Sequence, residues 1–387
     1  MKNVYVIADN IVSPLGYSTT ENLQQLKAKR TGIRHIEAGI FSQQAFYASI
    51  IDSVQLGEKF SLLKTEADCT RLEKMMILSV ADALSQAEID ITGEDTLLLV
   101  STTKGNIDLL AQHIAGENNA TRRIYLWSMA RHLANYFSMK TRPMVVSCAC
   151  ISGVLAITSA ARLIQDGQFK NVIVVGGDII SEFVVSGFLS FRSISDGPCK
   201  PFDKARSGLS LGEGCGTIVL SGDEGSCKDP CPVIYKGGAS GNDANHISAP
   251  SRTGEGLYRV IRKTFEDAQQ FSVSGVEYIS AHGTATLYND ESESISISRA
   301  GLESVPVNSL KGYWGHTLGA AGIIESIAAI HSIKDQCIYA TLGYEQSGVS
   351  PTITIASDYS EIKINNILKT ASGFGGCNAA IIFGRAD

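Results

Sequence analysis

One cysteine stands where a buried strand is expected to turn directly into a helix. Residues 145–163 read VVSCACISGVLAITSAARL, so a Val-rich run is followed by Cys150 and then by an Ala-rich segment that begins at Ser152. The positive end of a helix favours a thiolate, and the unpaired N–H groups of its first turn can receive an oxyanion. The segment predicts either a nucleophile at Cys150 or a buried structural thiol. Cys148 lies two residues earlier on the same face, and we expect it to be a buried side chain that only contributes to packing.

Two histidines lie in glycine-containing stretches farther along the chain. In YISAHGTATLYND, residues 278–290, His282 ends a predicted strand, which is where α/β folds place their ligands. In VNSLKGYWGHTLGAAGIIESIAAI, residues 307–330, His316 directly precedes a predicted helix. A helix N-terminus disfavours imidazolium, so we expect His316 to stay neutral and to donate one N–H. A hydrogen-bonded structural histidine is the competing interpretation of His282.

The second of these stretches also predicts a buried ion pair. Glu325 lies inside the predicted helix on an apolar background. A buried carboxylate needs a partner, and Lys311 is the nearest obvious candidate. Such a pair either tunes the electrostatics around His316 or serves only the structure.

A glycine-rich turn precedes the last predicted strand. In SGFGGCNAAIIF, residues 372–383, three glycines surround Phe374 and give its backbone unusual freedom. Such a loop can present an N–H to an oxyanion and move an aromatic side chain. Taken alone, a glycine-rich turn before a strand is usually only a turn.

Two further segments are expected to be structural. In KPFDKARSGLSLGEGCG, residues 200–216, we expect Asp203 and Arg206 to pair on a loop. Cys227 and Cys231 lie in the polar loop SCKDPC, but no second Cys/His pair with zinc-finger spacing follows, so a zinc site is disfavoured. The sequence implies neither a metal nor a redox cofactor.

The composition limits the classes of protein that the chain can belong to. Its 387 residues are 44% hydrophobic and 19% charged, with a formal charge of −6, which indicates a globular protein and a poor general binder of nucleic acid. We expect no membrane span, because no stretch of about 18 uncharged apolar residues occurs. The N-terminus lacks a long apolar region, so a secretion signal is not expected. Nine scattered cysteines favour a reducing cytoplasm.

Short apolar runs alternate with longer amphipathic segments, which is typical of an α/β protein with largely parallel, buried strands. Ser18 and Glu21 have the spacing of a capping box before the first helix. Strands are predicted at Val4–Ala8, Leu97–Ser101, Met144–Cys148, Val172–Val175, Thr217–Leu220, Val233–Tyr235, Tyr278–Ala281 and Ala379–Phe383. Helices are predicted at Glu21–Arg30, Ala67–Ala87, Tyr125–Tyr136, Ser152–Gln165, Gly254–Gln269, Asp290–Ala300 and Leu318–Ile333.

The Gly/Pro-rich, charged stretch Ser221–Pro232 is the best candidate boundary between two halves. Residues 144–167 and 305–333 share one pattern: a strand, a short polar loop, small residues and then a helix. This is a weak sign of internal duplication. We therefore predict two domains, residues 1–225 with the cysteine and residues 226–387 with the two histidines and the glycine-rich turn.

Together, and in this order, the motifs resemble those of the β-ketoacyl-acyl-carrier-protein synthases of the type I/II class, in the thiolase-like superfamily. The family pattern is Ala-Cys-x-Ser-Gly, then His-Gly-Thr, then Lys-(x)4-His-x-x-Gly-Ala-Ala-Gly, then Gly-Phe-Gly-Gly-x-Asn. The matching residues span essentially the whole chain: Ala149–Gly153, His282–Thr284, Lys311, His316–Gly322 and Gly373–Asn378, with Val12–Gly16 and Pro201–Asp203. The resemblance implies an α/β thiolase-like fold, two similar βαβαβαββ halves in a five-layered αβαβα arrangement, usually dimeric.

The resemblance also implies an acyltransferase that performs a decarboxylative Claisen condensation. Cys150 would accept the acyl chain as a thioester, and the N–H groups of Cys150 and Phe374 would hold the oxyanion. His282 and His316 would donate hydrogen bonds to the thioester carbonyl of malonyl-acyl carrier protein. The enolate formed as carbon dioxide leaves would then attack the Cys150 thioester, giving a 3-oxoacyl-acyl carrier protein.

Other matching residues would support this chemistry. Lys311, paired with Glu325, would tune the field around His316, and Thr284 and Gly375 would support the site. Phe374 would act as a gate between the acyl and malonyl steps.

The chain departs from the family pattern in several places. The segment 105–142 is short, Tyr313 and Trp314 are bulky beside the second histidine, Ser372 stands where an aromatic residue is common, and Cys377 replaces a usual Thr. We hypothesise a specialised synthase of polyketide or polyene type, with ordinary fatty-acid synthesis as the other possibility. Two alternatives stay open: a non-catalytic chain-length partner of a heterodimeric ketosynthase, and a thiolase that uses Cys377 as its second cysteine.

The implied partners are acyl carrier protein and a second subunit, either another copy or a related ketosynthase. Acyl carrier protein is acidic, so docking on a chain of net charge −6 requires a local basic patch. The candidates are Lys64, Arg71 and Lys74 in one region and Arg122 with Arg123 in another. Solvated helix faces explain these residues equally well.

Overall fold

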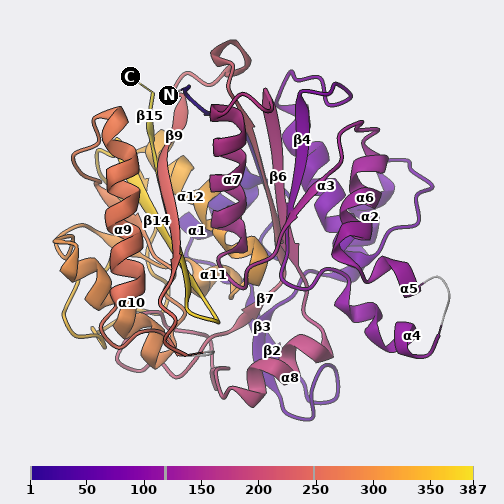
Figure 1. Cartoon of the computed structure of the whole chain (residues 1–387). Coiled ribbons are helices and arrows are strands. Elements are labelled where there is room, and N and C mark those ends of the chain that lie inside the picture. The colour runs from indigo at the N-terminus through magenta and orange to yellow at the C-terminus, as the bar shows by residue number, and fades with distance from the viewer. Residues whose placement is uncertain (1, 117–119, 247–248, 387) are drawn as a thin grey trace.

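Ten strands form one hydrogen-bonded sheet in the computed structural model, which describes residues 2–116, 120–246 and 249–386 (Figure 1). These strands are β1 (Tyr5–Val12), β4 (Thr96–Ser101), β5 (Met144–Val146), β6 (Asn171–Asp178), β8 (Gly214–Ser221), β9 (Val233–Asn242), β10 (Tyr278–Ser280), β11 (Val307–Asn308), β14 (Asn366–Gly373) and β15 (Cys377–Arg385). They lie in the order β11-β10-β14-β15-β9-β1-β8-β6-β4-β5. The short strands β2 (Ile33–Ile36), β3 (Phe46–Ser49), β7 (Leu211–Gly212), β12 (Cys337–Ile338) and β13 (Ser360–Glu361) form two small sheets.

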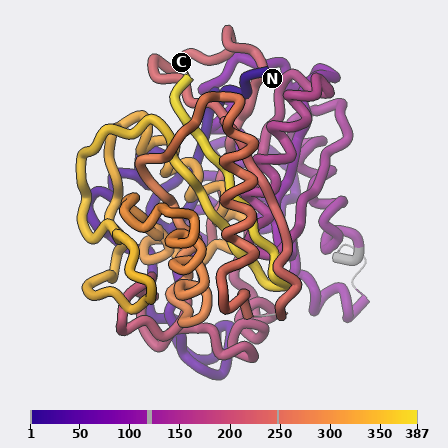
Figure 2. Tube along the Cα trace, turned by 60° about the vertical axis from the view of Figure 1, so that its left-hand side comes forward, coloured from indigo at the N-terminus to yellow at the C-terminus, as the bar shows by residue number. Residues whose placement is uncertain are grey.

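The sheet contains one topology twice. In the N-terminal half, β5-β4-β6 are parallel neighbours, and β8 joins β6 to β1 by antiparallel pairing. In the C-terminal half, β11-β10-β14 are parallel neighbours, and β15 joins β14 to β9 in the same way. The halves meet through a short antiparallel pairing of Tyr5 and Val6 with Ile234 and Val233. Because Tyr5 near the start of the chain and Gly384 near its end both pair with Ile234 of β9, both chain ends lie at one end of the molecule (Figure 2).

The expectation of largely parallel strands is wrong for this sheet. Each half contains two antiparallel pairings, and a fifth joins the halves. Continuous apolar runs had suggested parallel strands because such strands are usually buried on both faces. Here β8 is buried along its whole length although both of its neighbours run antiparallel to it. Because helices cover both faces of the sheet, an apolar run indicates that a strand is buried but does not indicate its direction.

The helices divide into three layers around the two half-sheets. They are α1 (Thr19–Lys27), α2 (Ser53–Ser61), α3 (Arg71–Ser85), α4 (Leu110–Ile114), α5 (Ala120–Arg123), α6 (Leu126–Tyr136), α7 (Ser152–Gln165), α8 (Glu182–Ser190), α9 (Glu255–Ala268), α10 (Leu287–Arg299), α11 (Lys311–Trp314) and α12 (Ala321–Asp335). Helices α7 and α12 pack together between the half-sheets, α3 covers the N-terminal half-sheet, and α9 covers the C-terminal one (Figure 1). Three large hydrophobic clusters fill the spaces between these layers. The five-layered αβαβα arrangement is confirmed.

Most of the expected elements occur within a few residues of their predicted bounds. Helix α7 begins and ends as predicted, and Ser18 and Glu21 form the expected capping box. Strand β14 and helices α2 and α8 were not predicted. In the described part of the chain, no helix combines the length and apolar character that a membrane crossing requires.

Candidate active site

The turn between β5 and α7 holds Cys150 in a fixed position. Ala149 adopts a left-handed backbone with φ of 45°, which an L-residue keeps only where its surroundings impose it. Ser152 Oγ accepts a hydrogen bond from the Cys148 N–H at 2.8 Å and donates one to the Ala149 carbonyl at 2.6 Å. An added Cβ at Gly153 would lie 2.8 Å from the Ile323 nitrogen, so the glycine lets α12 approach the first turn of α7. The small residues of this motif are needed for close backbone packing around Cys150.

The thiol of Cys150 is nearly buried, with 7% exposure. Burial raises its pKa to about 11, while Lys104, Lys311 and the Phe374 N–H, which hydrogen-bonds to the thiol, act in the opposite direction. The positive end of α7 also favours the thiolate. The expected helix effect is therefore opposed by a larger desolvation effect, and the thiol of the free protein is protonated at neutral pH.

Because the pKa of Cys150 is raised, we expect its alkylation by iodoacetamide to accelerate about tenfold per pH unit from about pH 7 to about pH 10. An ordinary thiol would instead level off above about pH 8.5. Tandem mass spectrometry of the peptide that spans residues 141–162 separates alkylation at Cys150 from alkylation at Cys148. A plateau at or below pH 8.5 for Cys150 would contradict the raised pKa.

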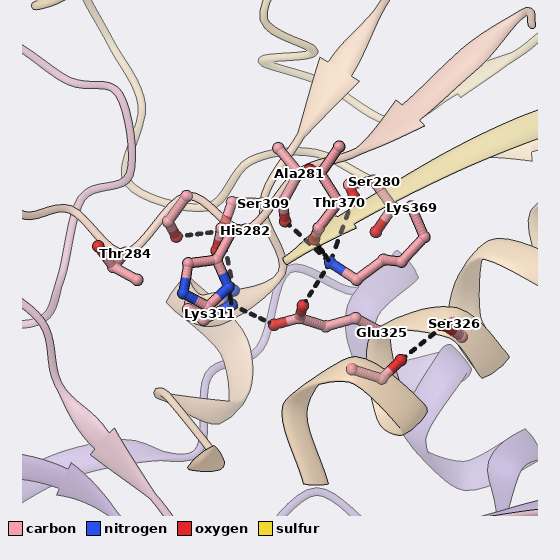
Figure 3. A network of polar contacts seen from close by, with 12 residues as sticks. Ser280, Ala281, His282, Thr284, Ser309, Lys311, Glu325, Ser326, Lys369 and Thr370 are labelled. Atoms are coloured by element: carbon pink, nitrogen blue, oxygen red, sulfur yellow. Dashed lines mark hydrogen bonds and ion pairs between the residues drawn. The ribbon is translucent and has the colours of Figure 1, made fainter. Parts of the chain in front are cut away.

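His282 lies at the end of β10, where Lys311 determines its tautomer (Figure 3). The Lys311 ammonium donates a hydrogen bond to the His282 carbonyl at 2.6 Å and lies 3.4 Å from the His282 Nδ1. An ammonium can only donate, so Nδ1 must accept and the proton of the neutral ring resides on Nε2. Burial, reinforced by Lys311, lowers the pKa of His282 well below 6.5. The residue is thus a fixed neutral N–H donor.

His316 lies across from His282, with the ring centroids 5.2 Å apart and the planes nearly perpendicular. It is 1% exposed, and burial followed by Lys311 lowers its pKa well below 6.5. Its Nδ1 is buried without a hydrogen-bond partner among the described residues. The expectation that His316 is neutral agrees with this environment, although burial is a larger cause than any helix effect.

The expected Lys311–Glu325 ion pair is present, and a second lysine joins it (Figure 3). Glu325 Oε1 lies 2.6 Å from the Lys311 Nζ, and its Oε2 lies 2.7 Å from the Lys369 Nζ. Both lysine side chains are 0% exposed. Lys369 also donates to the carbonyls of Ser280, Ala281 and Thr370. Burial lowers the pKa of Lys369, and Glu325 opposes this change. Sequence reasoning missed Lys369 because strand β14 was not predicted.

Two carboxylates of helix α10 hold the backbone around His282. Glu293 accepts hydrogen bonds from the N–H groups of His282 at 2.8 Å and Gly283 at 2.7 Å, and Asp290 accepts from the Thr284 N–H at 2.9 Å. Burial raises the pKa of Asp290 to about 6. Sequence reasoning named Asp290 only as a helix start and missed Glu293. The spacing of Asp290, Glu293 and buried Ile297 on one helical face was the available signal.

Removal of Glu325 should destabilise the protein strongly. In Glu325→Gln, two buried ammonium groups share no anionic partner, and loss of one member of a buried ion pair costs about 3–5 kcal/mol. Chemical denaturation monitored by circular dichroism measures the free energy of unfolding. Asp358→Asn, in the exposed pair with Lys29, is the matched control and should leave it essentially unchanged. Equal stabilities of the two variants would show that the buried charges are compensated elsewhere.

Phe374 lies at the tip of the hairpin between β14 and β15. Gly375 and Gly376 have positive φ values of 84° and 75° and close the turn. A Cβ added at Gly373 would lie 3.0 Å from the Cys150 nitrogen, so the hairpin directly contacts the nucleophile turn. The N–H groups of Cys150 and Phe374 are therefore close to one sulfur atom, an arrangement suited to an oxyanion.

Two cavities meet at this point. A cavity of about 290 Å³ is lined by His282, Thr284 and His316. A more apolar cavity of about 1060 Å³ is lined by residues of α4 and α8. Cys150 and the aromatic cluster of Phe188, Phe191 and Phe374 line both cavities; the Phe374 ring centroid lies 5.6 Å from that of Phe188 and 5.1 Å from that of Phe191. Phe374 thus lies between the smaller cavity that holds the two histidines and the larger, more apolar cavity.

Several secondary expectations need correction. The side chains of Asp203 and Arg206 do not pair: Asp203 accepts backbone N–H groups, and the Arg206 guanidinium donates to the carbonyls of Asp203 and Gly348. The N–H and C=O groups of the surrounding loops would otherwise lack hydrogen-bond partners, so the two charged side chains bind these backbone groups and not each other. The segment is structural, as expected.

The two expected basic patches are smaller than predicted. Arg71 is committed to Glu213 at 2.6 Å, and Arg123 to Glu73 at 2.7 Å. Both guanidinium groups therefore serve the fold. Of the five candidates, Lys64 and Arg122 are exposed and Lys74 is half-buried.

Comparisons with known proteins agree with the fold and with the motifs. The family "Beta-ketoacyl synthase, N-terminal domain" matches residues 1–225, and "Beta-ketoacyl synthase, C-terminal domain" matches residues 233–345. The chain is 30% identical to a putative mitochondrial 3-oxoacyl-[acyl-carrier-protein] synthase of Schizosaccharomyces pombe and 26% identical to 3-oxoacyl-[acyl-carrier-protein] synthase 2 of Vibrio harveyi. These alignments cover 99% of this chain and 99% and 98% of the relatives, respectively.

Solved structures share the fold over the full chain. A chain of the Xenorhabdus doucetiae complex between a ketosynthase and its chain length factor superposes with a TM-score of 0.86 at 24% identity, covering 100% of this chain and 98% of that chain. A β-ketoacyl synthase from Burkholderia phymatum superposes with a TM-score of 0.85 at 24% identity, covering 100% of both chains. With two family matches, a full-length relative and this fold, the chain belongs to the β-ketoacyl synthase family of the thiolase-like superfamily.

Proposed function

We propose that this chain catalyses the decarboxylative condensation of an acyl thioester, held on Cys150, with malonyl-acyl carrier protein. The observation that carries the proposal is the convergence of one thiol and two neutral imidazoles on a single cavity. A nucleophile alone would suit many acyl transfers. Two fixed neutral donors suit formation of an enolate, because they stabilise negative charge on oxygen without taking part in proton exchange.

In the first half-reaction, the Cys150 thiolate attacks the thioester carbonyl of an acyl-carrier protein. The N–H groups of Cys150 and Phe374 stabilise the tetrahedral oxyanion. The carbon–sulfur bond to the carrier breaks, and the carrier thiolate takes up the proton that Cys150 lost on becoming a thiolate. The acyl chain extends into the apolar cavity, whose volume of about 1060 Å³ can hold a long or aromatic chain.

In the second half-reaction, His282 Nε2–H and the N–H of His316 donate to the thioester oxygen of the malonyl group. The bond to the carboxylate breaks, carbon dioxide leaves, and the electron pair forms the enolate. The enolate carbon attacks the Cys150 thioester, and the thiolate leaves as the 3-oxoacyl product forms. Lys311 positions His282 and, with Glu325 and Lys369, keeps positive charge next to the developing enolate.

A second subunit is proposed to close the apolar cavity. Ile40, Ile114 and Phe183 line this cavity and are 56%, 75% and 51% exposed, which is unusual for large apolar side chains that line one surface hollow. We expect Ile114→Glu to convert a dimer into a monomer in light-scattering measurements, whereas Val54→Glu, at an equally exposed position outside the cavity, should remain dimeric. A monomeric parent chain that dimerises only with a related ketosynthase would indicate a heterodimer.

Two observations weigh on the alternatives. A silent chain-length partner would need no nucleophile, yet Cys150 and both histidines line one cavity. A thiolase would need a second cysteine in that cavity, but among the described residues that line the two cavities the only cysteine is Cys150. The condensing function is therefore favoured over both.

The remaining parts of the proposal concern organisation, carrier and location. We propose that residues 1–225 and 226–387 are the two domains, in keeping with the repeated strand order. Lys64 and Arg122 are the remaining exposed candidates for carrier docking, and the product class is a specialised polyketide or polyene or an ordinary fatty acid. A cytoplasmic location is supported by nine free cysteines.

Intact-protein mass spectrometry tests the central proposal. After incubation with an acyl-carrier-protein thioester, the protein should gain one acyl mass, and malonyl-acyl carrier protein should then release carbon dioxide and discharge that mass as product. Saturated, unsaturated and aryl primers should be compared to identify the product class. A folded protein that gains no mass from any donor would overturn the proposal in favour of the chain-length partner.

A further inference from the structure

Two cysteines outside the catalytic chemistry lie close together beside the active site. The Sγ atoms of Cys148 and Cys377 are 3.6 Å apart, although the residues are 229 positions apart in sequence. Both side chains are half-buried, so a small solute can reach them. The Asn242 Nδ2 lies 3.3 Å from the Cys377 Sγ and orients that sulfur. The other seven cysteines are also free.

The two thiols belong to the two turns that form the oxyanion site. The backbone of Cys148 forms an isolated β-bridge with that of Cys150 in the turn after β5. The Cys148 N–H donates a hydrogen bond to the Ser152 hydroxyl. Cys377 begins β15 and pairs with Gly373 across the base of the hairpin that carries Phe374. A covalent bond between the two sulfurs would therefore join the base of the Phe374 hairpin to the turn that holds Cys150.

We propose that Cys148 and Cys377 are a site of reversible disulfide formation by peroxides, and that the disulfide restrains the Phe374 hairpin. One thiolate attacks hydrogen peroxide, forming a sulfenic acid and releasing hydroxide. The second sulfur attacks the first, so that the S–S bond forms, the S–O bond breaks and water leaves. In total, two thiols and one peroxide give one disulfide and two waters. A thiol or phosphine reductant reverses the reaction.

The distance between the two sulfurs allows a disulfide to form, and the raised pKa of Cys148 makes its formation slow. Disulfide formation requires the sulfurs to approach by about 1.5 Å, to the usual bond length of about 2.05 Å, which half-buried side chains on two turns can accommodate. Burial and the neighbouring Cys377 raise the pKa of Cys148 to about 11, so little thiolate is present at neutral pH and the oxidation is slow there. Transient disulfides of this kind are compatible with a reducing compartment.

Peptide mapping tests the bond independently of any enzymatic activity. The Cys150→Ala variant is treated with hydrogen peroxide at about pH 10, closer to the raised pKa of Cys148, and digested with trypsin under non-reducing conditions. Cleavage gives residues 141–162, with Cys148 as the only cysteine in this variant, and residues 370–385, with Cys377 as the only cysteine. We expect one peptide of the summed mass less two hydrogens, which a phosphine reductant splits. Its absence, or cross-links among other cysteines only, would overturn the proposal.

A second experiment tests the effect on the hairpin and rests on the proposed condensation. Cys150 of the wild type is first acylated, which protects it as a thioester, then treated with peroxide, cleared with catalase and given malonyl-acyl carrier protein. We expect condensation to slow at least about tenfold and to recover with phosphine, because the disulfide would restrain the hairpin of Phe374, which lines both of the cavities that the two steps use. Cys377→Ser should lose no activity on the same treatment relative to its own untreated rate. Equal losses in both proteins, or a cross-link without slowing, would overturn the role in gating.

Discussion

Cys150→Ala should lose acyl transfer while retaining decarboxylation of malonyl-acyl carrier protein. Cys150 is the only cysteine among the described residues that line the two cavities, so its loss removes the group that would hold the acyl chain as a thioester. We expect the condensation rate to fall by at least about 10³-fold, as when the nucleophile of a hydrolase is removed. His282 and His316 lie on other loops, so enolate formation should stay within about tenfold of the wild type.

The two half-reactions must be measured separately. Intact mass reports the acyl adduct, and trapped radiolabelled carbon dioxide reports decarboxylation. Cys148→Ala is the matched control, because it removes a thiol two residues away on the same turn and should keep both half-reactions. An acyl adduct on Cys150→Ala would contradict the assignment of the nucleophile. Loss of decarboxylation in this variant, with the fold intact, would show that the thiol also takes part in enolate formation.

The motif residues could be placed by sequence because each depends on short-range structure. A Val-rich strand, a turn and an Ala-rich helix fix Cys150 within one segment, and α7 has the predicted bounds. Glycines mark the points where backbones approach: a Cβ at Gly153 or Gly322 would lie within 3 Å of backbone atoms in the facing helix. Such local patterns correctly predict the ends of elements where the reactive side chains lie.

Lys369 shows what a sequence pattern cannot supply. A lysine inside NILKTASG interrupts an apolar run and argues against a buried central strand, so β14 was not predicted. The lysine is tolerated because Glu325 and the carbonyls of Ser280 and Ala281, all distant in sequence, surround its ammonium together with the carbonyl of the adjacent Thr370. Partners brought together only by the tertiary fold cannot be read from periodicity. The same limit explains why Arg71 and Arg123 were expected to be surface charges. In the fold they form ion pairs with the buried carboxylates of Glu213 and Glu73, respectively.

Loss of either histidine should impair decarboxylation more than acylation. In the proposed mechanism each imidazole supplies one hydrogen bond to the enolate oxygen, and removal of one such donor costs about 10²–10³ in rate. We therefore expect His282→Ala and His316→Ala to lower carbon dioxide release by about this factor, while the acyl adduct on Cys150 still forms. His282→Asn, which keeps an N–H donor near the same place, should recover part of the loss. His35→Ala, at an exposed position that lines neither cavity, is the control.

The pH profile distinguishes donors from acid–base catalysts. Burial lowers the pKa of both histidines well below 6.5, so both rings remain neutral as the pH falls through the range where an ordinary histidine gains its proton. Carbon dioxide release by wild-type enzyme should show no histidine inflection near pH 6.5, whereas an inflection near pH 6 that persists in His282→Ala would come from Asp290, whose pKa is raised to about 6 by burial. If an inflection appears there and vanishes in His282→Ala, the ring exchanges a proton during the reaction. A flat profile together with rescue by His282→Asn would instead require only a hydrogen bond, because asparagine cannot act as a base at these pH values.

The same comparison at His316 tests whether the two hydrogen-bond donors are equivalent. Since both act on one oxygen, the double variant should lose less than the product of the single losses.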